Sequence, residues 1–155
     1  MRLLRTLLVF ELGVWTGMAA AAAVMKRTLP SAGTEESDEL ALVAILDGKK
    51  LTSRSSAFRG GSLLAWLGGI DVDLREAKLA PDARLRLTAL LGGISIRIPE
   101  EWRVESNMKA VAGGVDVKAL GAGDPAAPTL TIEGRAVLGG VAVGSGRART
   151  AEPES

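Results

Sequence analysis

Apolar and polar residues alternate in several short segments of the chain. Residues 94–98 read Ile-Ser-Ile-Arg-Ile, and residues 70–74, 84–87 and 115–118 show the same alternation. A period of two residues is typical of a β-strand that buries one face and exposes the other. We therefore expect a set of short, half-buried strands in this part of the chain.

A pair of glycines precedes most of these strands, within the longer pattern Ala-x-x-Gly-Gly-(Ile/Val)-x-(Val/Ile). The four best copies begin, at intervals of 24, 21 and 26 residues, at Ala65, Ala89, Ala110 and Ala136. Two weaker copies begin at Ala44 and Ala57. The repeat glycines are Gly60, Gly61, Gly68, Gly69, Gly92, Gly93, Gly113, Gly114, Gly139 and Gly140. Intervals of this length are those of one coil of a solenoid protein.

The repeat predicts an all-β fold, a single-stranded β-solenoid or β-helix-like stack of Gly-Gly coils. Adjacent glycines allow either a positive φ at a corner or a close approach of neighbouring coils, so we expect them to form a ladder at one edge. The expected core is the stack of apolar residues after each pair, Ile70, Val72, Ile94, Ile96, Val115, Val117, Val141 and Val143. The alternative is an antiparallel β-sandwich, in which the same segments are hairpins with glycine bulges.

The amino terminus is apolar over residues 3–25 and is flanked by Arg2 and by Lys26-Arg27. This length and these flanks predict one transmembrane helix, and a cleaved secretory signal is the alternative. The candidate helix-contact residues are a carboxylate at depth and three small residues spaced by four, namely Glu11, Gly13, Gly17 and Ala21.

The chain therefore divides into an anchor helix at 1–27, a flexible linker at 28–40, a β-repeat domain at 41–144 and a disordered tail at 145–155. The linker contains Pro30, Gly33 and an acidic cluster and lacks apolar periodicity. We expect a single-pass protein of the cell membrane. Basic residues lie on both sides of the span, so the sequence leaves the side of the domain open.

Composition narrows the chemistry that the domain can perform. The chain has no cysteine, histidine or tyrosine, which excludes a His-containing catalytic triad and a Cys or His zinc site. The net charge is +1 and aromatic residues make up 3% of the chain, so neither a basic stripe nor a stacking platform for nucleic acid is expected. The sequence indicates no cofactor and no enzyme.

A few polar and aromatic residues still require an interpretation. Asp71 and Asp73 alternate with apolar residues and are interpreted as the solvent face of a strand, with Asp73 beside Arg97 of the next coil. Trp102, after the corner at Pro99, is interpreted as a cap on the core. We give Trp66 the same interpretation.

The run from Gly68 to Ser106, followed by residues 109–117, resembles the carboxy-terminal domain of the LiaF-like family of cell-wall-active antibiotic response proteins. The positions that carry the resemblance are Gly68, Gly69, Asp73, Leu74, Arg75, Ala77, Gly92, Gly93, Pro99, Trp102, Val104, Gly113, Gly114 and Val115. The resemblance implies a membrane-associated accessory protein of bacterial envelope-stress signalling, with a membrane histidine kinase or another envelope protein as its partner. Such relatives usually carry several membrane helices before the domain, and this chain has room for one.

Three functional hypotheses follow. The first is a membrane-anchored, non-enzymatic accessory protein that acts by protein–protein contact in the envelope-stress response. The second is a structural scaffold at the membrane, a homo-oligomer in which solenoids stack end to end through open strand edges. The third is a carbohydrate-active enzyme that uses Asp71, Asp73 or Glu100, which requires two carboxylates about 5 to 9.5 Å apart in one cleft.

Overall fold

The computed structural model describes residues 20–21, 23–24, 27–28, 31–118 and 124–146, and the chain forms two units, Met1–Pro30 and Ser31–Ser155. The described residues of the first unit are helical with exposed side chains, Ala21 among them. Most of the expected anchor, including Glu11, Gly13 and Gly17, lies outside the described residues, as do residues 147–155 of the expected tail. The first two residues assigned to that tail, 145–146, instead end the last β-strand, so this predicted boundary is wrong. Within the described part of the chain, no helix has the length and hydropathy that a bilayer crossing requires.

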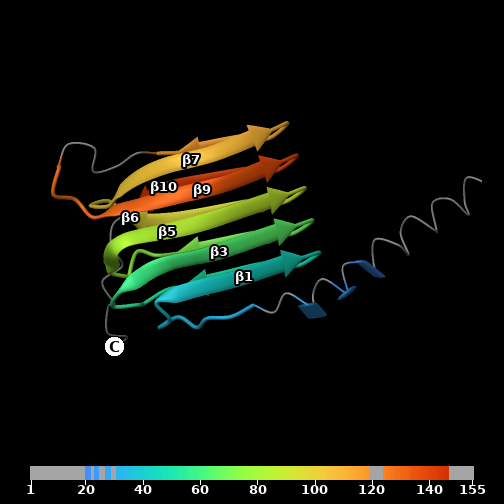
Figure 1. Ribbon diagram of the computed structural model, residues 1–155, viewed down its shortest axis with the longest axis horizontal. Coiled ribbons are helices and arrows are strands. Elements are labelled where there is room, and N and C mark those ends of the chain that lie inside the picture. The colour runs from blue at the N-terminus through green and yellow to red at the C-terminus, as the bar shows by residue number, and fades with distance from the viewer. Residues whose placement is uncertain (1–19, 22, 25–26, 29–30, 119–123, 147–155) are drawn as a thin grey trace, which may run out of the picture. The chain divides into compact units, whose positions relative to one another are not determined.

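The second unit is built from ten described β-strands in two five-stranded sheets (Figure 1). Sheet A has the order β1-β3-β5-β9-β7, and sheet B has the order β2-β4-β6-β10-β8. The strands of sheet A are β1 (Glu39–Ile45), β3 (Phe58–Trp66), β5 (Leu79–Leu90), β7 (Arg103–Val111) and β9 (Thr129–Val137). Those of sheet B are β2 (Gly48–Thr52), β4 (Gly69–Asp73), β6 (Gly93–Pro99), β8 (Gly114–Val117) and β10 (Gly140–Gly146).

The chain alternates between the two sheets, so each odd strand and the even strand after it form one coil. Coils 1 to 5 are β1-β2, β3-β4, β5-β6, β7-β8 and β9-β10. All pairings between these strands are parallel, and the glycine pairs stand in register, for example Gly69 with Gly93 and Gly93 with Gly140. This agrees with the expected all-β stack of repeated coils. The antiparallel sandwich is wrong, because hairpins cannot give parallel neighbours.

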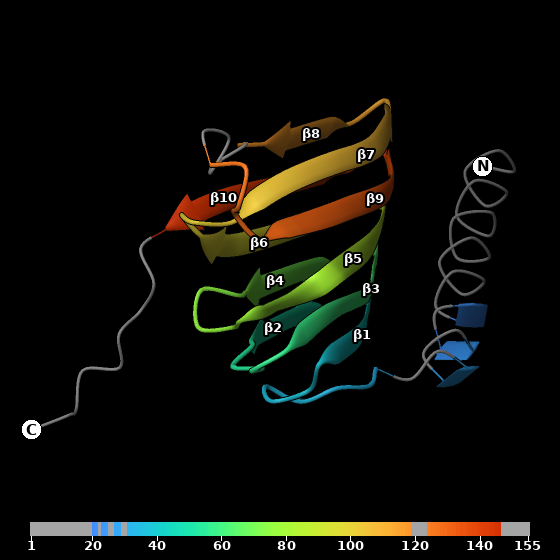
Figure 2. The same ribbon diagram turned by 60° about the vertical axis from the view of Figure 1, so that its left-hand side comes forward.

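The coils do not stack in sequence order. Coil 5 lies between coils 3 and 4, so that β9 separates β5 from β7 and β10 separates β6 from β8 (Figure 2). The physical reason is the polarity of the strands. Strand β9 buries Leu130 and Ile132 completely, whereas most of β7 is exposed and polar. The apolar coil therefore takes an interior place, and the polar coil becomes the edge.

The core lies between the two sheets and follows the alternation in the sequence. Ile70, Ile94 and Val141 form a buried row on sheet B and face a row of leucines and isoleucines on sheet A. Val115 and Val117, expected in the same core, are only partly buried, because coil 4 ends the stack. Trp102 is buried against the core and confirms its interpretation as a cap. Trp66 is half-buried at the corner instead.

The glycine ladder is present at the corner between the sheets, in the order of the stack. A Cβ added to the first glycine of a pair would lie under 3.0 Å from the backbone oxygen of the neighbouring coil, as Gly92 does from Gly68. A Cβ on the second glycine of each pair would meet no atom closer than 3.9 Å. Close approach of two backbones thus explains the first glycine. Asp47 and Gly48 take the same places in coil 1.

Positive φ does not fall on these glycines. It falls on the residue before each pair, where φ lies between 50° and 54°, in the set Leu46, Leu67, Leu91, Ala112 and Leu138. Gly60 and Gly61, assigned by sequence to a weak copy of the repeat, lie inside β3 and outside the corner ladder. Both have positive φ and approach the backbones of Arg84 and Leu40.

Residues 31–38, assigned by sequence to the linker, lie along the first coil. Ala32 and Ala41 exchange two backbone hydrogen bonds of 2.7 and 2.8 Å, and the Val43 amide donates to the Ser31 hydroxyl at 3.1 Å. The Arg59 amide donates to the Asp38 carbonyl at 2.7 Å. This segment therefore covers the outer side of coil 1, and we call it the amino-terminal cap.

The two glycines of one corner should respond differently to the same substitution. We expect Gly92→Ala to lower the free energy of unfolding by about 3 kcal/mol, because the new methyl group forces neighbouring backbones apart. Gly93→Ala, which has room for a Cβ, should cost less than about 1 kcal/mol. Urea unfolding of the two variants measures the difference. Equal losses would contradict the close-approach explanation.

Candidate functional site

A band of apolar residues lines the corner that follows the strands of sheet A, and all of them except the buried Ile45 are at least partly exposed. Two residues of each coil contribute, in register from strand to strand, and we call the set the corner edge. Its members are Ile45, Leu46, Trp66, Leu67, Leu90, Leu91, Val111, Ala112, Val137 and Leu138. The solvent-exposed fractions of Leu46, Leu91 and Leu138 are 54%, 48% and 57%.

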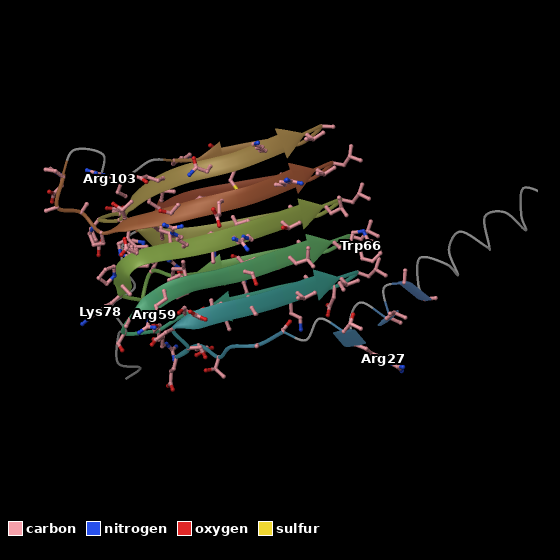
Figure 3. The ribbon with its side chains drawn as sticks, viewed as in Figure 1. Arg27, Arg59, Trp66, Lys78 and Arg103 are labelled. Carbon is pink, nitrogen blue, oxygen red and sulfur yellow. The ribbon has the colours of Figure 1, made fainter. Side chains whose placement is uncertain are left out.

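The two ends of the strands of sheet A differ in chemistry. Trp66 lies at the corner edge, where the strands end, whereas Arg59, Lys78 and Arg103 lie at the opposite end (Figure 3). Exposed apolar side chains that occur singly need no explanation, but a continuous row across five coils is unusual for a water-facing surface. The corner edge is therefore the first candidate contact surface.

The backbone at the corner edge adds a second argument. Leucine in the left-handed region costs about 1 kcal/mol or more at each position, and glycine or asparagine would avoid most of this cost. Three of the five corners nevertheless place an exposed leucine there, Leu46, Leu91 and Leu138. The amides of these three leucines donate to carbonyls of the neighbouring coils, at 3.1 Å for Leu46, 3.0 Å for Leu91 and 3.1 Å for Leu138, so the backbone conformation is part of the corner. Their exposed side chains, however, add little burial. Residues held in a strained conformation while exposed are candidates for binding.

A shallow groove of about 800 Å³ runs over the outer face of sheet B beside the same corner. Its floor is largely bare backbone, because the second glycine of each pair lines it, in the set Gly48, Gly69, Gly93, Gly114 and Gly140. The next two residues of each strand also line it. The outward ones are Lys50, Asp71, Ser95, Asp116 and Ala142, whereas the side chains of Ile70, Ile94 and Val141 are buried in the core. The groove and the corner edge meet along the glycine ladder.

Charge in the groove is sparse. Asp71 lies 3.9 Å from the Lys50 amine and 3.6 Å from the Arg97 guanidinium, measured to its two carboxylate oxygens, and its Oδ1 accepts no hydrogen bond among the described residues. The other carboxylate of the groove, Asp116, is three strands away in sheet B, or about 14 Å. That separation exceeds the distance that paired catalytic carboxylates of glycosidases require.

Asp73 does not lie on the solvent face, as its alternation suggested. Its register with Arg97 is as expected, but its side chain folds under Arg75 and the residue is 9% exposed. The Arg75 Nε donates to Asp73 Oδ1 at 2.8 Å, and this hydrogen bond holds the pKa of Asp73 below its usual value. The Asp73–Arg75 pair lies where β4 ends, and its direct hydrogen bonds indicate a structural role.

A second group of charges attaches the amino-terminal cap to the coils. Arg54 donates to Glu76 at 3.0 Å and lies 3.3 Å from Glu35, and these contacts raise the pKa of Arg54. The Ser55 hydroxyl donates to Asp38 at 2.7 Å. In the part of the chain that the structure describes, no group of three or more acidic side chains could hold a metal ion.

Sequence reasoning found the glycines of this corner but missed the surface that they support. The sequence does contain a signal for this surface, because an apolar residue stands before each glycine pair. Alternation along the preceding strand, however, predicts that this residue faces the core. Leu46, Leu91 and Leu138 are exposed instead because the chain turns at these positions. The Asp71 and Asp73 carboxylates, which the sequence brought together, make separate ion pairs.

The Asp73–Arg75 pair should make stability depend on pH. A carboxyl group whose pKa is lower in the folded chain stabilises the fold above its unfolded pKa of about 3.9, and this contribution is lost as pH falls through the folded pKa. We expect the unaltered chain to lose more stability between about pH 5 and about pH 2 than the Asp73→Asn variant. Urea midpoints measure this, with Asp116→Asn as the control for removing one carboxylate. Parallel curves for all three proteins would contradict it.

Comparisons with known proteins give one relative. No family model matches the chain, and no solved structure matches it. The chain is 30% identical over 103 residues to a protein of Mycobacterium tuberculosis (strain CDC 1551 / Oshkosh) named "Uncharacterized protein MT0994". The similarity covers 66% of this chain and 52% of that protein. The chain thus spans about half the length of the relative that it matches.

Proposed function

We propose that this protein is a membrane-anchored, non-enzymatic accessory protein that acts by protein–protein contact through its corner edge. The observation that carries the proposal is the row of exposed leucines, each held at a positive φ. A surface that keeps apolar side chains in water and in a strained conformation is best explained by a partner that covers them.

The arrangement of polar groups supports a binding role rather than catalysis. Asp73 and Glu76 are engaged by Arg75 and Arg54, and Asp71 lies between two cations. The groove beside the corner has an apolar floor of glycine backbone. Such a floor can accept a flat or extended segment of another protein, and the two carboxylates beside it, Asp71 and Asp116, lie too far apart to act as a catalytic pair.

The setting that we propose is the bacterial envelope. The apolar segment at residues 3–25 supports a membrane anchor, and the resemblance to the LiaF-like carboxy-terminal domain supports a role in envelope-stress signalling. In that role the corner edge would contact a membrane histidine kinase or another envelope protein. The end-to-end scaffold is less well supported, because the amino-terminal cap covers the outer side of coil 1.

Fractionation tests the membrane part of the proposal. The full-length chain should sediment with membranes and should require detergent for its release, because the apolar segment remains attached. The measurement is immunoblotting of membrane and soluble fractions, with the mass of the chain determined at the same time. Recovery of a shortened chain in the soluble fraction would refute the anchor.

Substitutions at the corner edge test whether it binds a partner, independently of any effect on folding. We expect the triple change Leu46→Asn, Leu91→Asn and Leu138→Asn to abolish co-purification of a crosslinked envelope protein. The melting temperature should stay within about 4 °C, because asparagine tolerates the left-handed region. Ser62→Asn with Thr88→Asn, on the outer face of sheet A, is the matched control. If the triple variant still captures the same partner, the corner edge is not the contact surface.

A further inference from the structure

The two ends of the stack differ in how far their terminal coils are covered. At the first end, the inward residues Leu40 and Leu42 are buried beneath the amino-terminal cap. At the other end, inward positions of coil 4 remain open, since Ser106 and Ala110 are exposed and Met108 is only partly buried. Strands β7 and β8 are the last strands of their sheets among the described residues.

The outer edge of β7 offers backbone groups in a defined pattern. The Arg103 amide donates to Pro128 and the Val111 carbonyl accepts from Leu138, so the odd-numbered residues of β7 direct their backbone groups toward β9. The backbone N–H and C=O groups of successive residues in a strand point to opposite edges. Those of the even-numbered residues of β7 therefore point to its open edge. These residues are Val104, Ser106, Met108 and Ala110. In the described residues, no strand pairs with this edge.

We propose that this edge binds β7 of a second copy of the chain, antiparallel and centred on Asn107. In this register Ser106 faces the partner's Met108, and Val104 faces the partner's Ala110, so all four open backbone positions form hydrogen-bonded pairs. The two five-stranded sheets A become one sheet of ten strands. Because the interface pairs one edge with itself, assembly stops at a dimer. The inference goes beyond the proposed function and does not depend on it.

The charges on β7 select this register. On the exposed face, Glu105 stands opposite the partner's Lys109, and two-fold symmetry repeats the pair. Within one copy, Lys109 lies in register with Arg135 of β9, a like-charge neighbour that is unfavourable. A carboxylate from the partner would offset this repulsion. The arriving strand therefore supplies the charge that the edge lacks.

The two neighbouring registers lack this match. Centring on Ser106 keeps the backbone pairing but sets Arg103 opposite the partner's Lys109, which is repulsive. Centring on Met108 sets Glu105 opposite the partner's Val111. Only the register centred on Asn107 combines paired backbone groups with two oppositely charged pairs, so we assign this register to the dimer.

Single cysteines test the register directly, because the chain has none of its own. In the proposed dimer, position 107 faces its own copy in a non-hydrogen-bonded pair with Cα atoms about 4.5 Å apart, which a disulfide can span. We expect Asn107→Cys, in the full chain in detergent, to give a disulfide-linked dimer under mild oxidation. Glu105→Cys is the matched control, since its two copies would be about 13 Å apart along the strands. Ser62→Cys on β3 controls for random collision.

Charge reversal provides an independent test. Glu105→Lys and Lys109→Glu should each weaken the dimer about tenfold, because each change places like charges together at two symmetric positions. The double reversal should restore the affinity of the unaltered chain. Sedimentation velocity in detergent measures the dimer fraction. Circular dichroism confirms that each variant is folded.

Three results would overturn the proposal. The first is equal crosslinking of the variants at 107, 105 and 62, and the second is a double reversal that remains as weak as either single change. The third is slow amide exchange at the even-numbered residues of β7 in a chain that sediments as a monomer, which would mean that this edge is covered by the chain itself. A dimer held only by its membrane segments would fail both the cysteine and the charge tests.

Discussion

The approach of one backbone to the next at the glycine corner is the contact on which the rest of the structure depends. At Gly68, Gly92, Gly113 and Gly139 there is no room for a Cβ between neighbouring coils. Because the corners are fixed in this way, the strands on either side leave them in register, and the second glycines of the pairs align across sheet B. Apolar residues two positions apart then stack into continuous rows, which no coil could bury alone.

Three consecutive positions at each corner meet three different requirements. The first takes a left-handed conformation, the second must lack a side chain, and the third faces an open groove, as Leu91, Gly92 and Gly93 illustrate. At the first position the amide donates to a carbonyl of the neighbouring coil, as from Leu91 to Val137 at 3.0 Å, whereas the exposed side chains of Leu46, Leu91 and Leu138 add little burial to the described domain. The same corner that determines the stack thus presents the surface that we assign to a partner.

The ends of the stack set how the protein can assemble. A solenoid must close its terminal coils or leave strand edges that pair with other chains. The amino-terminal cap closes coil 1 through backbone hydrogen bonds and through Arg54, whereas coil 4 carries polar residues and an edge with which no described strand pairs. One closed end and one open end favour a finite assembly over a filament.

The sequence by itself determined the strands and which residues of each strand face the core, because both follow from local alternation. It also determined the glycine ladder and the pairing of Asp73 with Arg97, because both follow from a repeated motif. It could not determine the order of the last two coils. All coils present nearly the same corner, so the motif does not say which coil lies beside which, and only the burial of whole strand faces places β9 inside and β7 at the edge. The exposure of Leu46, Leu91 and Leu138, the burial of Asp73 under Arg75 and the place of Gly60 inside β3 were also decided by the tertiary structure. Each of these depends on where a neighbouring backbone or side chain lies in space, which alternation along the chain does not specify.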